Sequence, residues 1–96
     1  LEITYTHSAN QGAALGDDVQ VSVTLKDPSG VLYDDAYVFA TFENPGSNDH
    51  TQRLDLVGSG SFEGVINIPK GEQTGDWKLV IVAVATVVAA LILNYL

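Results

Sequence analysis

The sequence contains no cysteine. A disulfide framework, a thiolate metal site and a cysteine nucleophile are therefore all excluded. Methionine is absent as well, so the chain as given does not begin at an initiator residue. We expect that a leader peptide has been removed, which would place the protein in the extracellular space or at the cell surface.

Basic residues are scarce. The chain has 4 Lys and Arg residues against 12 Asp and Glu residues, and its formal net charge is −8. Nucleic acids and anionic lipid headgroups are both recognised through basic surfaces. The composition therefore argues against nucleic acid, and against anionic headgroups, as partners of this chain.

No stretch of residues 1–78 repeats its apolar residues with the period of a helix. Short runs in which apolar and polar residues alternate are found instead. In residues 19–25, for example, every second residue is Val or Leu and the residues between them are Gln, Ser and Thr. Such alternation predicts strands with one buried face. Turn-forming Gly, Pro, Asn and Asp residues separate the runs. Strands are expected over residues 2–6, 19–25, 36–42, 52–57 and 62–68, and from residue 77 onward.

With 96 residues the chain forms one domain, and several short strands in one domain predict an all-β antiparallel sandwich. Inward-facing positions of these strands should form the core, with Trp77 as its central aromatic side chain. The expected core residues are Val21, Val23, Phe39, Leu54, Leu56, Trp77, Leu79 and Ile81.

Charge is confined to residues 1–78, and residues 79–96 carry none. This shift divides the chain into a head, residues 1–78, and an apolar C-terminal segment, residues 79–96, that continues the sixth strand. An apolar segment of this length needs a buried environment, which we expect to be a partner subunit or a membrane. An internal seventh strand is a less favoured alternative. The residues expected to be buried there are Val80, Val82, Val84, Val87, Val88, Leu91, Ile92, Leu93 and Leu96.

Three alternative structures are compatible with the sequence of residues 79–96. As a transmembrane helix they would reach roughly 27 Å, close to the thickness of a bilayer core. The many β-branched residues favour a strand instead. A mixture is the third alternative, with a strand to about Ala83 and an apolar helix over residues 85–96.

Four stretches of the head carry a resemblance to known proteins. They are the alternating run that ends in Asp27-Pro28-Ser29-Gly30, residues 35–42, residues 54–64, and the stretch Thr74-Gly75-Asp76-Trp77 with the apolar residues after it. Together they resemble the extracellular immunoglobulin-like or macroglobulin-like domains of bacterial and archaeal surface proteins. The resemblance implies an immunoglobulin-like sandwich of six to seven strands, in which the stretch that contains Trp77 is the penultimate strand and Trp77 packs into the core.

The sequence departs from this pattern after Ala83, where the polar turn before a seventh strand is missing. A sandwich without its last strand has an open groove. A strand from the next subunit could fill that groove, and head-to-tail repetition of the contact would build a fibre.

Residue patterns for catalysis or cofactor binding are weak. His7 and His50 lack the spacing of metal ligands. The stretch Gly58-Ser59-Gly60-Ser61 joins two expected strands, so it is interpreted as a hairpin and not as a nucleophile elbow. Calcium is the one candidate cofactor, although turn formation explains the carboxylates better. The carboxylates in question are the pairs Asp17-Asp18 and Asp34-Asp35 beside expected strand starts, and Asp27, Asp49 and Asp76 in loops. We expect no enzyme activity, and no small-molecule substrate is identified.

These observations favour a non-catalytic extracellular structural protein. It would be a subunit of a cell-surface assembly or pilus-like filament, held to other copies through the apolar C-terminal segment. The alternative is a membrane-anchored extracytoplasmic binding or adhesion module with a C-terminal transmembrane helix.

Overall fold

Six antiparallel strands build the structure, a computed structural model that describes residues 1–9, 11–46 and 48–85. They are β1 (Glu2–His7), β2 (Asp18–Lys26), β3 (Ala36–Glu43), β4 (Asp49–Gly58), β5 (Ser61–Asn67) and β6 (Lys78–Ala85). The described residues contain no helix. The expected all-β class is confirmed. β6 begins at the last charged residue of the sequence and continues to Ala85, inside the uncharged segment.

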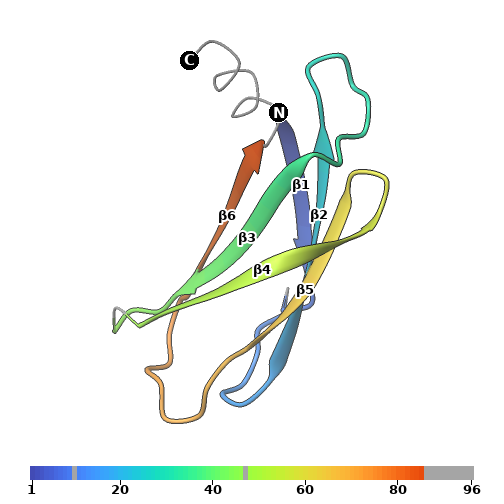
Figure 1. Cartoon of the computed structure of the whole chain (residues 1–96). Coiled ribbons are helices and arrows are strands. Elements are labelled where there is room, and N and C mark those ends of the chain that lie inside the picture. Colours follow the sequence, from blue (N-terminus) through green and yellow to red (C-terminus); the bar gives the residue numbers. More distant parts are fainter. Residues whose placement is uncertain (10, 47, 86–96) are drawn as a thin grey trace.

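The strands form one sheet in the order β1-β2-β5-β4-β3-β6 (Figure 1). This sheet is curled, and β4 joins its two parts because the two halves of β4 pair with different strands. The first part of β4 pairs with β3 as far as Leu54, which lies opposite Val38. From Asp55 onward β4 pairs with β5 instead, with a register shift between Leu56 and Gly58. The exchange of partners brings β3 and β6 around to face β2 and β5.

The core lies inside the curl. Alternation in β2 places Val19, Val21, Val23 and Leu25 on the inner face, where each is at most 1% exposed. The polar residues between them point to the other face, as expected for a strand with one buried side. The remaining buried apolar residues come from β3, β4, β5 and the residue after β5, and they are Val38, Ala40, Phe42, Leu54, Phe62, Ile66 and Ile68.

Phe39 and Leu56 differ from the core residues expected from the sequence. Side chains alternate along a strand, and in β3 the inner face is taken by Val38, Ala40 and Phe42, so Phe39 lies on the opposite face. Leu56 is 49% exposed, because it lies beyond the point at which β4 leaves β3. Neither residue belongs to the core cluster.

Trp77 was expected at the centre of the core but is half-buried at its margin. Its ring meets Phe42 edge-on, with 6.5 Å between the ring centroids, and stacks on His50 at 6.0 Å. Phe42 is 6% exposed and is the aromatic residue nearer the centre. Leu79 and Ile81 of β6 also pack against the core and are only partly buried.

The turn after β2 is organised by Asp27. Its Oδ1 accepts hydrogen bonds from the Ser29 N–H at 2.9 Å, the Ser29 Oγ at 2.7 Å and the Val31 N–H at 3.0 Å. Hydrogen bonds to a carboxylate favour its charged form. The bond from the Ser29 side chain, followed by the one from the Val31 backbone, lowers the pKa of Asp27 below its ordinary value of 3.8.

We expect this turn to make stability depend on acidity. Since the pKa of Asp27 is lowered on folding, its contribution is present above 3.8 and is lost as the pH falls through the lower, folded value. Asp27→Asn keeps an acceptor oxygen but does not titrate. Urea unfolding should show the variant to be less stable than the parent near neutral pH, with the difference shrinking in strong acid. A difference that is the same at both pH values would contradict this role.

Candidate interaction surface

An apolar patch covers the outer face of β3 and β6, on the side away from the core. In the antiparallel register, Phe39 lies opposite Val82, and Tyr37 lies opposite Val84. Tyr37 is 46% exposed, Val82 47% and Val84 52%, while Phe39 and Val80 are half-buried. These five residues, Tyr37, Phe39, Val80, Val82 and Val84, are called the outer patch below.

The outer patch ends at β4, where polar groups begin. The guanidinium of Arg53 lies over the ring of Tyr37, 4.6 Å from its centroid, in the geometry of a cation–π contact. Arg53 also lies opposite Phe39 in the pairing of β3 with β4. Next along the same pair of strands, the hydroxyls of Thr41 and Thr51 are hydrogen-bonded at 2.8 Å. The patch is therefore apolar along β6 and bordered by polar side chains on β4.

Of the residues that the sequence marked for burial in a partner, the structure describes three. Val82 and Val84 are exposed on the outer patch, and Val80 beside them is half-buried. The others, Val87, Val88, Leu91, Ile92, Leu93 and Leu96, lie outside the described residues. The described part of the uncharged segment is therefore a strand with one face on the core and one face toward solvent.

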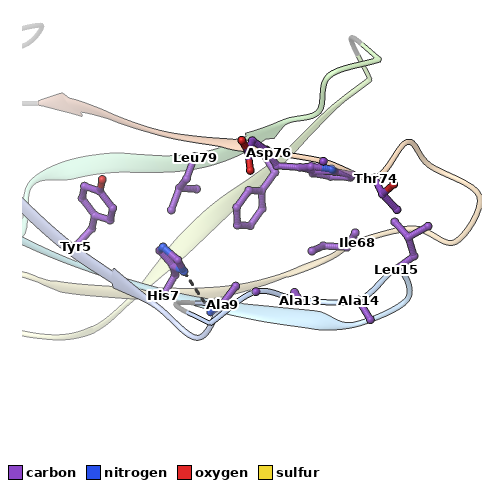
Figure 2. Close-up of a pocket in the computed structure, with 14 residues that line it drawn as sticks. Tyr5, His7, Ala9, Ala13, Ala14, Leu15, Ile68, Thr74, Asp76 and Leu79 are labelled. Carbon is purple, nitrogen blue, oxygen red and sulfur yellow. Dashed lines mark hydrogen bonds between the residues drawn. The ribbon is translucent and has the colours of Figure 1, made fainter.

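A cavity of about 610 Å³ opens between the two edge strands of the curled sheet (Figure 2). Tyr5 and His7 point into it from β1, and Leu79 points toward them from β6. Phe42 and Ile68 come to it from the core, and Ala9 and residues 12–15 also line it. We call this opening, with the free edges of β1 and β6 on either side of it, the seam.

Trp77 forms part of the seam, and a hydrogen-bond network holds the loop before it. Glu72 is the centre of this network. Its Oε2 accepts hydrogen bonds from the side-chain amides of Asn44 and Asn48, and its Oε1 lies 2.8 Å from the Nε2 of His50. The Trp77 Nε1–H donates to the carbonyl of Gln73 at 3.0 Å. The loop is thereby tied to the turn between β3 and β4, and one wall of the seam is preformed.

The polar side chains that were considered as metal ligands in the sequence accept hydrogen bonds instead, mostly within turns or between a turn and a strand. Asp17 accepts a hydrogen bond from the Ala14 N–H, Asp18 from the side chain of Asn67, and Asp34 from the Gly60 N–H. His7 accepts one from the Ala9 N–H and does not join His50, which pairs with Glu72. No three His, Asp or Glu side chains in the described part of the chain are placed to hold a metal ion.

Comparison with family models, with curated proteins and with solved structures finds no match to this chain. In the portion of the chain that the structure describes, no helix has the length and apolar character needed to cross a membrane.

Proposed function

We propose that this chain is a non-catalytic structural subunit that acts through contacts with other protein chains, in a cell-surface assembly or filament. The observation that carries this proposal is the outer patch together with its continuation. β6 presents Val82 and Val84 to solvent and leads directly into residues 86–96, which carry no charge. In the sequence, the strand that carries the exposed valines is therefore followed by a long apolar segment.

Such a surface is costly to leave in water. Edge strands of stable monomers are commonly protected by charges, bulges or covering segments. β6 has a charge only at Lys78, its first residue, and the rest of the strand is Leu, Val, Ile and Ala. Full burial of a valine contributes about 1.5–3 kcal/mol, so Val82 and Val84, each about half exposed, would each gain on the order of 1 kcal/mol when covered.

The strand order supports a finer interpretation of the fold. Immunoglobulin constant-type domains pair their first, second, fifth and fourth strands in one sheet, and their third, sixth and seventh in the other. Here β1-β2-β5-β4 and β3-β6 occur in the corresponding order. We therefore infer an immunoglobulin-like sandwich of which residues 1–9, 11–46 and 48–85 supply the first six strands. The cell-surface location rests on the resemblance of the sequence to extracellular domains of this kind.

The proposal predicts that assembly depends on residues 86–96 and on the outer patch. The intact chain, purified without detergent, should form regular assemblies visible by negative-stain electron microscopy and should sediment at high speed. Deletion of residues 86–96 should leave soluble monomers. Val84→Asp should weaken assembly at least tenfold, because a carboxylate would have to be buried in the contact.

Val65→Asp is the matched control for Val84→Asp. Val65 is also a strand valine with 52% exposure, but it lies on β5, away from the outer patch. Assembly that survives Val84→Asp and the deletion would overturn the proposal. A chain that becomes monodisperse only in detergent would instead favour a membrane-anchored binding module, with the uncharged residues 86–96 after β6 as the anchor.

A further inference from the structure

We infer that the seam is a docking groove for one extended strand, and that residues 86–96 of a second copy supply this strand. The inference rests on the proposed function and adds to it the place where the segment binds. The groove is separate from the outer patch, since the seam opens toward the core while the patch faces away from it.

The first argument is the pair of free strand edges. Within residues 1–9, 11–46 and 48–85, β1 pairs with β2 alone and β6 pairs with β3 alone. The cavity is lined from both of these edge strands, by Tyr5 and His7 of β1 and by Leu79 of β6. A strand laid into the seam would have unpaired backbone N–H and C=O groups available beside it. Strand addition to an open sheet edge uses such groups for affinity and adjacent pockets for specificity.

The second argument is the chemistry of the groove. Most of its lining is apolar or small, and the large aliphatic and aromatic contacts are Tyr5, Leu15, Phe42, Ile68, Trp77 and Leu79. Among the lining residues, Asp76 is the one Asp, Glu, Lys or Arg. An uncharged apolar peptide fits this lining, whereas an acidic one would meet a chain that already carries a net charge of −8. Residues 86–96 are uncharged and predominantly apolar.

The third argument is length. An extended chain rises about 3.3 Å per residue, so the 11 residues from 86 to 96 would reach roughly 36 Å. The 8 residues of β6 extend roughly 26 Å on the same scale. The segment can therefore run along the whole free edge of β6 and still leave residues to connect two copies.

The direction of β6 indicates that the strand comes from another copy. β6 starts beside the cavity, at Leu79, and ends at Ala85, opposite the first residue of β3. To return along its own edge, the chain would need a tight turn directly after Ala85. Tight hairpins depend on Gly, Asn or Asp, and residues 86–93 contain none of them and no Pro. A segment that continues away from its own domain reaches a neighbour instead, and each copy then gives one strand and accepts one.

The alternation of the segment sets which side chains would enter the groove. In an extended strand the odd-numbered set is Val87, Ala89, Leu91, Leu93 and Tyr95, in which the Tyr95 hydroxyl is the single polar group. The even-numbered set includes Thr86 and Asn94. We therefore assign the odd-numbered residues to the groove and the even-numbered ones to the outside.

The test uses the full chain and three substitutions, with assembly measured by sedimentation and electron microscopy. Leu91→Arg places a charge inside the groove and should reduce assembly at least tenfold, whereas Ile92→Arg, on the outer side, should reduce it much less. Ala13→Trp fills the groove from an exposed loop residue that lines it, and should also block assembly. Val57→Trp is its control, because Val57 is 58% exposed and does not line the cavity. Circular dichroism would verify that each variant is folded.

The absence of native cysteine allows a direct check of the partner. Chains with Ala13→Cys are mixed with differently tagged chains with Leu91→Cys, and a short bis-maleimide is added. Cross-linked heterodimers are expected, and Val65→Cys in place of Ala13→Cys should give none. A chain with both substitutions that cross-links only within itself would overturn the inference, because the strand would then be the chain's own.

The outcomes separate this inference from the proposed function. If deletion of residues 86–96 abolishes assembly while Ala13→Trp has no effect and the two arginine variants behave alike, the segment is buried elsewhere and the groove assignment is wrong. If neither the deletion nor Val84→Asp affects assembly, the proposed function fails as well. Loss with Leu91→Arg and Ala13→Trp, but not with Ile92→Arg and Val57→Trp, is the result that we expect.

Discussion

Leu54→Ala should lower the free energy of unfolding by about 3 kcal/mol, within the 2–5 kcal/mol typical of a buried leucine truncated to alanine. Leu54 is 2% exposed and lies at the point where β4 changes partner from β3 to β5. Its Cδ2 occupies the space beside Gly64, where a Cβ on that glycine would come within 2.6 Å of it. Truncation would leave a cavity where the two halves of the curled sheet meet. Urea unfolding monitored by the fluorescence of Trp77, the single tryptophan, measures the loss.

Leu56→Ala is the matched control, because it removes the same atoms from the same strand two residues later. Leu56 is 49% exposed, so its truncation removes little buried surface and should cost less than about 1 kcal/mol. Similar losses in the two variants would mean that Leu56 faces inward, and that β4 does not change partner where the structure places the change.

The presence of the six strands could be predicted from local composition, because each strand is short, rich in β-branched or aromatic residues and bounded by turn formers. The bounds of β4 differ, since it begins at Asp49, three residues before the expected start at residue 52. The face that is buried could be predicted only where the other face is polar. In β2, Gln20, Ser22 and Thr24 alternate with apolar residues, and the choice of the buried face is unambiguous. The structure buries the apolar set completely.

The buried face of β3 is marked less clearly than that of β2, because large aromatic side chains lie on both faces. The inner face holds Val38, Ala40 and Phe42, whereas the outer face begins with Tyr37 and Phe39 and continues with the polar residues Thr41 and Glu43. Selecting the aromatic Phe39 as a core residue was wrong, since the wholly apolar alternate set that contains Phe42 takes the inner face. The aromatic part of the outer face contributes to the outer patch.

Leu56 shows a second limit of local patterns. Leu54 and Leu56 lie on the same side of an ideal strand, so alternation predicts the same burial for both. Burial also requires a neighbouring layer, and β3 continues past Leu54 without pairing to the next residues of β4. The identity of the neighbour at each residue is a property of the whole sheet, which alternation within one strand does not describe.

The two parts of the candidate surface differ in how far the sequence predicts them. Outward-facing valines in residues 79–85 follow from a strand in which no alternate position is polar, and the structure places Val82 and Val84 on the exposed face. The seam depends on the approach of β1 to β6, which lie at opposite ends of the described chain. Its wall depends on Glu72 reaching Asn44 and His50, 28 and 22 residues away in the sequence. Contacts of this separation arise from the curl of the sheet.

Gly60→Ala should be the most destabilising glycine substitution in the turns, with a loss of about 2–5 kcal/mol. Gly60 has a φ of +62°, which costs a residue with a Cβ about 1–2 kcal/mol. A Cβ there would also lie 2.7 Å from the carbonyl oxygen of Leu25 and 3.0 Å from the Cβ of Leu32, so the backbone would have to shift at further cost. That shift would strain the hydrogen bond from the Leu25 N–H to the Gly60 carbonyl and the one from the Gly60 N–H to Asp34.

Gly30→Ala separates the conformational cost from the steric one. Gly30 has a φ of +85°, but no atom lies within 4 Å of where its Cβ would be, so this substitution should cost only about 1–2 kcal/mol. Urea unfolding of both variants measures the difference, which is the cost of the close approach between the β4–β5 turn and the end of β2. Equal losses in the two variants would mean that this turn does not pack against Leu25, and the anchoring of β4 and β5 onto β2 at this end of the sheet would have to be reconsidered. A larger loss for Gly60→Ala would support the packing of the β4–β5 turn against Leu25 and Leu32.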